Sequence, residues 1–333
     1  MRYLQKTSRT RKANLDIKDK KILALISANS RMPLTQLSKK IALSRDAINY
    51  RIKNYEKNGI IQGYRTIVDM SKFGYHSTHL FIKLNNPSKE IETKIINKLT
   101  KYPFIRAILK FSGNYDLEIA FIAKDIKNLD EILTQIIIDC SGAIQDYELL
   151  TISKTFAAET FPPNFSEYKL KREIKKGATK KIDRKDIEIL NIISEEATLP
   201  LHEIAGKVKL SADAVAYRIK NMVNSGTILK FVPVINYTSL NYNLYTILLN
   251  VNGLDEEKEK VLKNFLSTDK NTLWAVKTIG RFNVLIYLLV QNIEDLQETT
   301  FKLRSLFPKQ INNYETLIAY EEYKYIYFPK DFL

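Results

Sequence analysis

Apolar residues near the start of the chain recur at the spacing of three short helices. Isoleucines and leucines within residues 16–27 lie at helical intervals behind an acidic first turn, which is typical of an amphipathic helix. Pro33 suits the start of a second short helix, and Ser44 is a favourable N-cap for a third. Gly59 supplies the left-handed residue that commonly ends a helix. Residues 15–70 are therefore expected to form a helix-turn-helix module.

The pattern changes from helical spacing to alternation after this module. Residues 60–69 are expected to form a strand that leads out of it. The following residues predict the order strand, helix, strand, strand, helix, strand, with a turn at Gly113-Asn114 before the third strand. The strands are expected at 75–84, 104–111, 115–123 and 143–155, and the helices at 88–101 and 126–139. This order is the ferredoxin-like plan, an antiparallel sheet with both helices on one face.

The whole pattern occurs twice. Residues from Leu15 onward align with residues from Ile182 onward at a constant offset of 167 positions, without a gap. Shared glycines, prolines and serines are the most informative matches, because they mark turns and caps. They include Pro33 and Pro200, Ser44 and Ser211, Gly59 and Gly226, and Gly113 and Gly280, beside the shared segment Tyr-Arg-Ile-Lys-Asn at 50–54 and 217–221. The chain therefore carries two copies of one unit.

The repeat predicts an α+β fold in six segments. Two winged helix-turn-helix modules are assigned to 15–70 and 182–237, and two ferredoxin-like domains of the order βαββαβ to 71–162 and 238–329. Residues 1–14 form a basic arm without an acidic residue, and residues 163–181 form a linker rich in Lys and Arg that is expected to be exposed.

Composition adds a positive surface. Lys and Arg exceed Asp and Glu by 15 over the 333 residues, which favours an anionic partner, although many basic proteins bind no polyanion. The single cysteine, Cys140, excludes an intrachain disulfide and is expected to be buried in a reducing compartment. No run approaches the ~20 apolar residues that span a bilayer, and the N-terminus lacks a signal-peptide core. A cytoplasmic protein without a membrane partner is expected.

The third helix of copy one carries the side chains that a DNA reader needs. In a helix-turn-helix this helix enters the major groove, and its N-terminal residues reach the base edges. Arg45 is expected to pair with guanine and Asn49 with adenine. Tyr50, Arg51 and Lys53 suit phosphate contacts, and Asp46 also faces outward. The alternative is a three-helix interaction module whose charged residues face water.

Copy two has lost the two base-reading side chains. Ala212 and Ala216 stand where copy one has Arg45 and Asn49. Ten basic residues oppose four acidic ones in 15–61, whereas six oppose seven in 182–228. Because phosphate neutralisation supplies most non-specific affinity, copy one is expected to bind DNA more strongly. Copy two is still expected to contact the DNA phosphate backbone, although more weakly, through Tyr217, Arg218 and Lys220.

Several short motifs resemble the Lrp/AsnC family of transcription regulators. They are Leu15-Asp16 with Asp19 and Ile22-Leu23, Leu43-Ser44, Tyr50 to Lys53, Gly59 to Ile61, Gly63-Tyr64 and the hairpin Gly113 to Asp116. The resemblance covers almost the whole chain, because each of the two copies resembles a complete family member. It implies binding to double-stranded DNA, oligomerisation through the ferredoxin-like domain and often an amino-acid effector near the Gly-x-x-Asp hairpin.

The resemblance implies effector candidates in both copies, namely Gly113, Asn114 and Asp116 in copy one and Gly280 and Asn283 in copy two. The carboxylate of Asp116 could hold an ammonium group, which the amide of Asn283 could not do by charge. The alternative is that both side chains cap a tight turn.

The tandem arrangement departs from the family pattern, because members usually have one unit and dimerise. The two sensing domains of this chain are therefore expected to pair face to face as an intramolecular pseudo-dimer. Pairing between chains uses the same surfaces and is the alternative, and further homo-oligomers are compatible with either.

Nothing in the sequence indicates a catalytic, metal or cofactor site. There is no Gly-rich phosphate loop and no CxxC motif. His76 and His79 are expected on opposite faces of one strand and cannot share a metal ion, and His202 has no partner nearby in sequence. Trp274, whose counterpart in copy one is Ala107, is expected to pack against the partner domain.

Two alternatives to a regulator stay open. Siroheme decarboxylases resemble paired Lrp/AsnC units, but they are expected to carry histidines before the third strand of the sheet. Residues 108–113 and 275–280 contain none. A sensor or scaffold that does not bind DNA is the other alternative. The sequence favours a sequence-specific DNA-binding transcription regulator that is not an enzyme.

Overall fold

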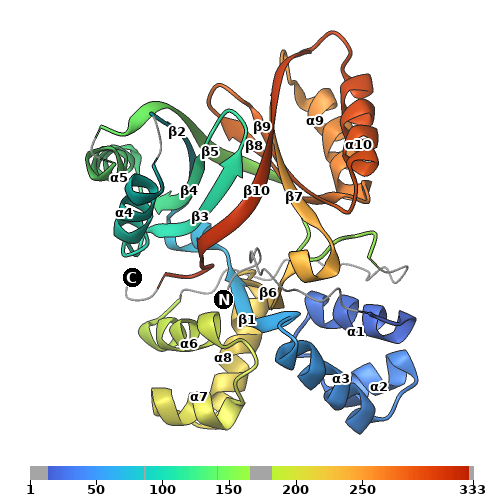
Figure 1. Cartoon of the computed structure of the whole chain (residues 1–333). Helices are drawn as coiled ribbons and strands as arrows, with labels where there is room; N and C mark the ends of the chain where they lie inside the picture. The colour runs from blue at the N-terminus through green and yellow to red at the C-terminus, as the bar shows by residue number, and fades with distance from the viewer. Residues whose placement is uncertain (1–13, 86–87, 141, 166–181, 330–333) are drawn as a thin grey trace.

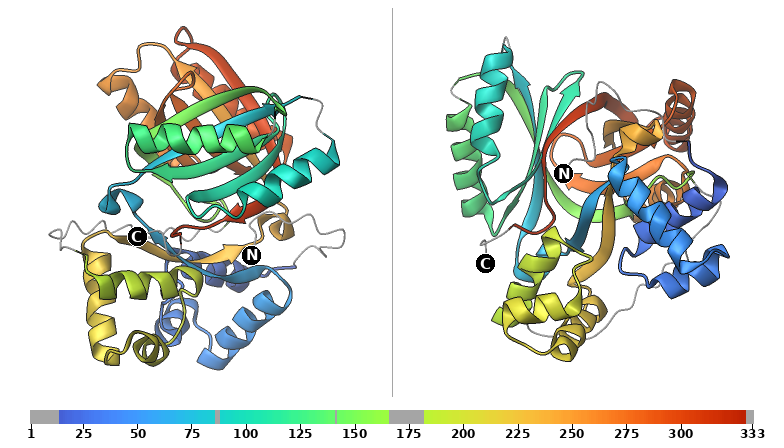
Figure 2. Two further views of the ribbon diagram at one scale, coloured as in Figure 1. Left: turned by 90° about the vertical axis from the view of Figure 1, so that its left-hand side faces the viewer. Right: turned by 60° about the horizontal axis from the view of Figure 1, so that its bottom comes forward.

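The computed structural model describes residues 14–85, 88–140, 142–165 and 182–329, which build two stacked units (Figure 1). The upper unit is a closed barrel with helices on its outside, and the lower unit holds both helix-turn-helix modules around a short ribbon (Figure 2). The expected basic arm and most of the expected linker lie outside the described residues. Within them, no helix is long and apolar enough to cross a membrane.

Each helix-turn-helix module has three helices that begin at residues suited to capping. In copy one they are α1 (Ile17–Ala28), α2 (Leu34–Ile41) and α3 (Arg45–Lys57), and in copy two α6 (Arg184–Glu195), α7 (Leu201–Val208) and α8 (Ala212–Asn224). A capping box starts the first helix of each module, with Asp16 and Asp19 in copy one and Asp183 and Asp186 in copy two. The expected three-helix pattern is confirmed in both copies.

The strands that leave the two modules pair with each other. Strand β1 (Ile61–Val68) runs antiparallel to β6 (Ile228–Ile235), and together they form a two-stranded ribbon. Helix α1 packs against β6, whereas α6 packs against β1. Each module therefore rests on a strand of the other copy, and neither is independent of its neighbour.

Each copy also contains the expected ferredoxin-like domain. Copy one has η1 (Met70–Phe73), β2 (His76–Leu84), α4 (Lys89–Leu99), β3 (Ile105–Ser112), β4 (Leu117–Ala123), α5 (Ile126–Asp139) and β5 (Ile144–Ala158). Copy two has η2 (Tyr237–Leu240), β7 (Asn243–Val251), α9 (Glu256–Thr268), β8 (Thr272–Ile279), β9 (Val284–Val290), α10 (Ile293–Leu306) and β10 (Ile311–Tyr325). The strand orders, β3-β4-β2-β5 and β8-β9-β7-β10, are equivalent. The α+β fold class is confirmed.

The two sheets close into one eight-stranded barrel, because β5 pairs with β8 and β10 pairs with β3. The expected face-to-face pairing thus also joins the sheets edge to edge, which leaves neither sheet with an open edge. The last strand of copy one continues to Ala158, beyond the expected end at 155, because its C-terminal half pairs with β8. The sequence of one strand does not reveal a partner that lies more than a hundred residues away.

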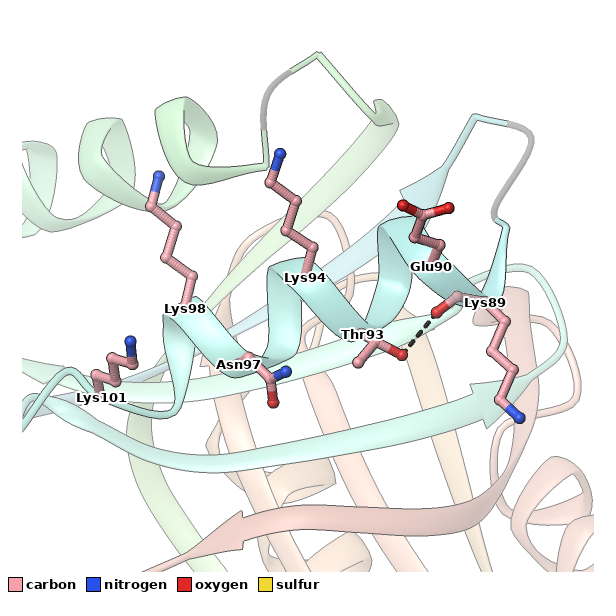
Figure 3. A pocket seen from close by; sticks show the side chains of 7 residues that line it. All are labelled: Lys89, Glu90, Thr93, Lys94, Asn97, Lys98 and Lys101. Carbon is pink, nitrogen blue, oxygen red and sulfur yellow. Dashed lines mark hydrogen bonds between the residues drawn. The ribbon is translucent and has the colours of Figure 1, made fainter.

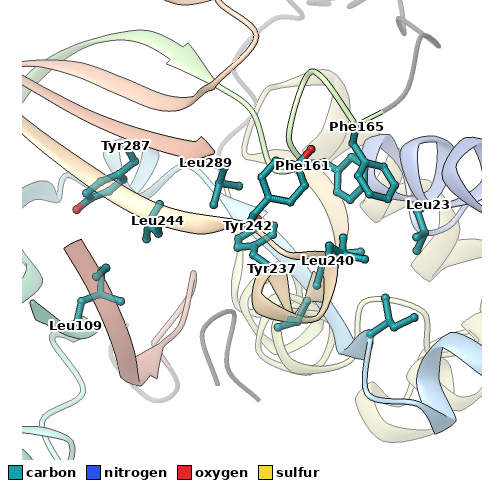
Figure 4. Close-up of a cluster of buried hydrophobic side chains, with 14 of the residues drawn as sticks. Leu23, Leu109, Phe161, Phe165, Tyr237, Leu240, Tyr242, Leu244, Tyr287 and Leu289 are labelled. Atoms are coloured by element: carbon teal, nitrogen blue, oxygen red, sulfur yellow. The ribbon is translucent and has the colours of Figure 1, made fainter. Parts of the chain in front are cut away.

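Alternation along the strands separates an inner core from two outer cores. On β2, Phe81 points into the barrel, whereas Leu80 and Ile82 pack under α4 and α5. Helices α9 and α10 cover the other sheet in the same way. The inner core continues past Leu244 and Tyr237 to Leu23 on α1, as Figure 4 shows. One hydrophobic core therefore connects the barrel with the first helix-turn-helix module.

Candidate nucleic-acid interface

The turn before the third helix has the same geometry in both modules. Ala42 and Lys209 adopt left-handed backbone with φ of 58° and 55°, and each closes the preceding short helix. The Oγ atoms of Ser44 and Ser211 each accept a 3.2 Å hydrogen bond from a backbone N–H in the first turn of the next helix. The helix-turn-helix geometry expected from the sequence therefore exists twice.

The N-terminal half of α3 presents the expected readers on the surface of copy one. Arg45, Asp46 and Lys53 are exposed and Asn49 is half-buried. Tyr50 is 67% exposed, which is unusual for a tyrosine and leaves its ring free of the module core. These side chains share one face of one helix. Which of them contact DNA stays a prediction.

The corresponding face of α8 is smaller and less charged. Ala212 and Ala216 are both half-buried, and Asp213 is the exposed acidic residue of the first turn. Tyr217 is 61% exposed and Lys220 is also exposed. The structure thus retains the contrast between copies that the sequence indicates.

Arg51 has a different environment from the phosphate contact expected for it. Its Nη1 atom lies 2.8 Å from Asp16 Oδ2 and 2.5 Å from Asp19 Oδ1. Tyr55 donates a 2.5 Å hydrogen bond to the same Asp19 oxygen. The Asp19 backbone N–H and, to a lesser degree, Arg51 hold the pKa of Asp16 below its ordinary value. Arg51 therefore ties the recognition helix to the start of α1, a positioning role that the sequence analysis missed.

Arg218 repeats this arrangement in copy two. Its Nη1 atom lies 2.7 Å from Asp183 Oδ2 and 2.8 Å from Asp186 Oδ1. This pairing lowers the pKa of the Asp183 carboxyl. The Tyr-Arg-Ile-Lys segment is thus shared between the copies partly because its arginine holds the module together.

Side chains from copy one fix the distance between the two modules. Arg31 donates from Nη1 to the carbonyl oxygen of Ala197 at 2.6 Å and from Nη2 to that of Leu199 at 3.1 Å. Thr66 on β1 donates to the carbonyl oxygen of Ile193 at 2.6 Å. Because these bonds are partly or fully buried, they hold α6 and its module against the ribbon. The two recognition helices therefore have a defined relative position.

The hairpins that carry the effector candidates lie on the seams between the sheets. Gly113 and Gly280 have φ of +145° and +154°, a region that favours glycine. A Cβ atom on Gly113 would lie 2.6 Å from Leu317 Cδ2, and one on Gly280 would lie 2.5 Å from the Leu149 carbonyl oxygen. Each glycine therefore permits close contact with the last strand of the opposite copy.

Two polar hairpin residues, Asp116 and Asn283, bind the backbone of their own sheets. Asp116 Oδ2 accepts a 2.7 Å hydrogen bond from the Leu84 N–H. Asn283 accepts from the Val251 N–H and donates to its carbonyl oxygen, both at 2.9 Å. These contacts tie each hairpin to the neighbouring strand, β2 or β7, and do not cap the turn itself. An ammonium contact of Asp116 stays a prediction.

The histidines and the cysteine form no joint site. His76 and His202 are exposed, whereas His79 is buried inside the barrel. No group of three or more His, Cys, Asp or Glu residues in the described part of the chain could hold a metal ion. Cys140 is a buried free cysteine, and burial raises the pKa of its thiol to about 11.

A second basic surface follows the outer face of α4. A groove of about 820 Å³ is lined there by Lys89, Glu90, Thr93, Lys94, Asn97, Lys98 and Lys101 (Figure 3). The lysine side chains extend away from the helix, and the counterparts of Lys89 and Lys98 in copy two are Glu256 and Phe265. Helix α4 is therefore a separate basic surface of copy one, on the other side of the molecule from α1–α3 (Figure 1), although Lys98 there pairs with Asp139.

Comparison with known proteins also finds a helix-turn-helix module in each copy. A family model described as winged helix-turn-helix DNA-binding matches residues 15–62 and 182–228. An uncharacterized HTH-type transcriptional regulator of Pyrococcus furiosus is 36% identical over 124 residues, which are 37% of this chain and 80% of the relative. The HTH-type transcriptional regulator LrpA of Pyrococcus horikoshii is 31% identical over 36% of this chain and 84% of its own length.

Solved structures of a siroheme decarboxylase match both copies together. The siroheme decarboxylase NirDL aligns over 94% of each chain with a TM-score of 0.63, at 14% sequence identity. At this identity the likeness concerns the fold, including the tandem arrangement of two units.

The two modules and their ribbon define a winged helix-turn-helix protein of the DNA-binding class. More narrowly, the chain belongs to the Lrp/AsnC family of transcription regulators, of which it contains two units in tandem.

Proposed function

We propose that this protein is a DNA-binding regulator with two unlike recognition helices. Copy one recognises the base sequence, and copy two binds the phosphate backbone of the DNA. The observation that carries this proposal is the placement of both modules on one side of the ribbon, away from the barrel (Figures 1 and 2). A single duplex can then meet α3 and α8 together. Because the two helices present different side chains, the two halves of the site differ.

The chemistry of each helix supports its role. Arg45 and Asn49 are the residue types that form paired hydrogen bonds with guanine and adenine in the major groove. In copy two, Tyr217 and Lys220 can bind phosphates, whereas Ala212 and Ala216 offer no hydrogen bond to a base. Copy two therefore contributes affinity with little base preference.

Selection of binding sites from random duplex DNA tests the proposal. We expect an asymmetric motif with one sharp half-site of a few base pairs, which contains guanine and adenine, and a weak half-site about one helical turn (~34 Å) away. An inverted repeat with two equally sharp halves would contradict the pairing of unlike readers. A chain that retains no duplex at any salt concentration would instead favour the sensor or scaffold.

Lys53→Ala is expected to weaken binding to every duplex by a similar factor. Since Lys53 is exposed on α3 and is assigned to a phosphate, its loss should make the slope of log affinity against log salt shallower by about 0.9. Titrations of the selected site and of a scrambled duplex at several salt concentrations measure both quantities. Loss of affinity for the selected site alone would assign Lys53 to base recognition.

An amino-acid effector at the hairpins remains part of the proposal, with copy one as the responsive half. Copy one retains a carboxylate at Asp116, and its neighbour Asn114 donates to Glu315 of β10 at 3.2 Å. A ligand that disturbs this contact acts on a seam of the barrel. Calorimetric titration with a panel of amino acids, on the native chain and on Asp116→Asn, tests this part separately from DNA binding.

An enzyme that acts on an iron tetrapyrrole is the second candidate, and the whole-chain likeness to a siroheme decarboxylase favours it. Against it, His79, the histidine inside the barrel, pairs with Glu118 at 2.5 Å and stacks on Trp274. The described hairpins contain no histidine. Addition of haem with observation of the visible spectrum discriminates the two, because the regulator is expected to leave the spectrum unchanged.

A further inference from the structure

The inner face of the barrel differs between the copies at one set of equivalent positions. In copy one, neighbouring strands place Ala107 beside Ala120, and Ala120 beside His79. In copy two the same positions hold Trp274, Tyr287 and Thr246, again as neighbours. One row thus consists of two small residues and a histidine, and the other of two large aromatic residues and a threonine.

The two rows meet inside the barrel. The His79 ring stacks on Trp274 with centroids 5.4 Å apart, and Trp274 stacks on Tyr287 at 5.2 Å. The large rings of copy two thus pack against His79 of copy one, whose row otherwise holds alanines. Stacked rings at this separation contribute beyond the area that they bury.

A buried carboxylate joins the rows by hydrogen bonds. Glu118 is 1% exposed, and its Oε1 atom lies 2.5 Å from His79 Nδ1. The same oxygen accepts a hydrogen bond from the Tyr287 hydroxyl of the opposite copy. The counterpart of Glu118 in copy two is Leu285, which has no polar atom to satisfy. The hydrogen bonds of Tyr287 to Glu118 and to His79 therefore join the two copies, whereas His79 and Glu118 also pair with each other within copy one.

Pairing of like copies would remove this complementarity. Two copy-one faces would bring together two buried carboxylates and four alanines, without a tyrosine for either carboxylate. Two copy-two faces would place two tryptophans and two tyrosines in the space that one pair fills. Both arrangements are unfavourable, the first because of cavities and because each buried carboxylate loses its hydrogen bond from a tyrosine, and the second because of overpacking.

We propose that this cluster determines pairing specificity, so that a copy-one sheet accepts only a copy-two sheet as its partner. The partner is the second half of the same chain. Barrels made from two equal halves are thereby disfavoured, and a copy-one module always lies beside a copy-two module. This inference does not depend on what the modules bind.

Two variants of the full chain test the proposal. The first, Thr246→His with Trp274→Ala, Leu285→Glu and Tyr287→Ala, makes two copy-one rows face each other. We expect its melting temperature to fall by about 10 °C or more. The second adds the reciprocal changes His79→Thr, Ala107→Trp, Glu118→Leu and Ala120→Tyr, so that the rows change places while the composition stays native. We expect this exchanged chain to melt within a few degrees of the native protein.

Circular dichroism gives the melting temperatures, and light scattering at low concentration reports whether the chain stays monomeric. A first variant as stable as the native chain would overturn the proposal, because like rows would then be tolerated. An exchanged chain as unstable as the first variant would also overturn the proposal. The stability would then depend on which residue occupies each position, and not on the complementarity between the two rows.

Discussion

Replacing both Arg45 and Asn49 with alanine is expected to weaken binding to the selected DNA site by about a hundredfold or more. Each paired contact with a base contributes about 1–3 kcal/mol of discrimination, or roughly five- to 150-fold. Binding to unrelated DNA should change much less, because phosphate contacts remain. Fluorescence anisotropy with the selected and a scrambled duplex, at one salt concentration, measures both affinities. An equal loss for the two duplexes would show that these residues do not read bases.

The reciprocal exchange in copy two is the matched control. Ala212 and Ala216 occupy on α8 the places that Arg45 and Asn49 occupy on α3. Ala212→Arg with Ala216→Asn should therefore sharpen the weak half-site, and repeated site selection should yield a motif closer to an inverted repeat. An unchanged motif would mean that other residues determine the sequence preference.

Gly280→Ala is expected to lower the free energy of unfolding by about 3 kcal/mol or more. The added Cβ atom would lie 2.5 Å from the Leu149 carbonyl oxygen and 2.6 Å from Leu150 Cδ2, at a backbone φ of +154°. Since a backbone oxygen in a strand cannot move aside easily, the β5–β8 seam must open. Chemical denaturation monitored by circular dichroism measures the loss.

Gly226→Ala separates backbone strain from the clash at the seam. Gly226 also has a positive φ, +74°, but no atom lies within 4 Å of an added Cβ. Its replacement should cost about 1 kcal/mol, which corresponds to the strain alone. If both substitutions lower the free energy of unfolding equally, the added Cβ atom at position 280 causes no clash beyond the backbone strain, and the tight packing at this seam is not a constraint on the barrel.

The local structure of this chain could be predicted from its sequence because local signals specify it. Ser44 and Ser211 mark helix starts, and Gly59 and Gly226 mark helix ends with φ of +70° and +74°. The ferredoxin-like order followed from alternation and turns in the same way. The second copy strengthened each interpretation, since a turn residue at the same position twice is hard to attribute to chance.

Contacts between distant segments could not be predicted in this way. Strand β1 gives no indication that its partner is β6, and Arg31 bonds to carbonyl oxygens at 197 and 199, which any sequence would provide. Arg51 was assigned to phosphates because helical spacing places it near the outer face. The acids that bind it lie more than thirty residues earlier. By contrast, the replacement of Ala107 by Trp274 was visible in the sequence and did indicate packing between the copies.

Closure of the barrel within one chain changes how assembly depends on the amount of protein. A regulator built from separate subunits dissociates on dilution, and the occupancy of its DNA site then falls with the square of the total protein concentration. Here the two halves are held at a fixed effective concentration by the covalent connection and by the β5–β8 and β10–β3 pairs. Occupancy of a site should therefore follow total protein linearly at low levels. Such a regulator keeps its two halves together at protein levels below the dissociation constant of an ordinary dimer.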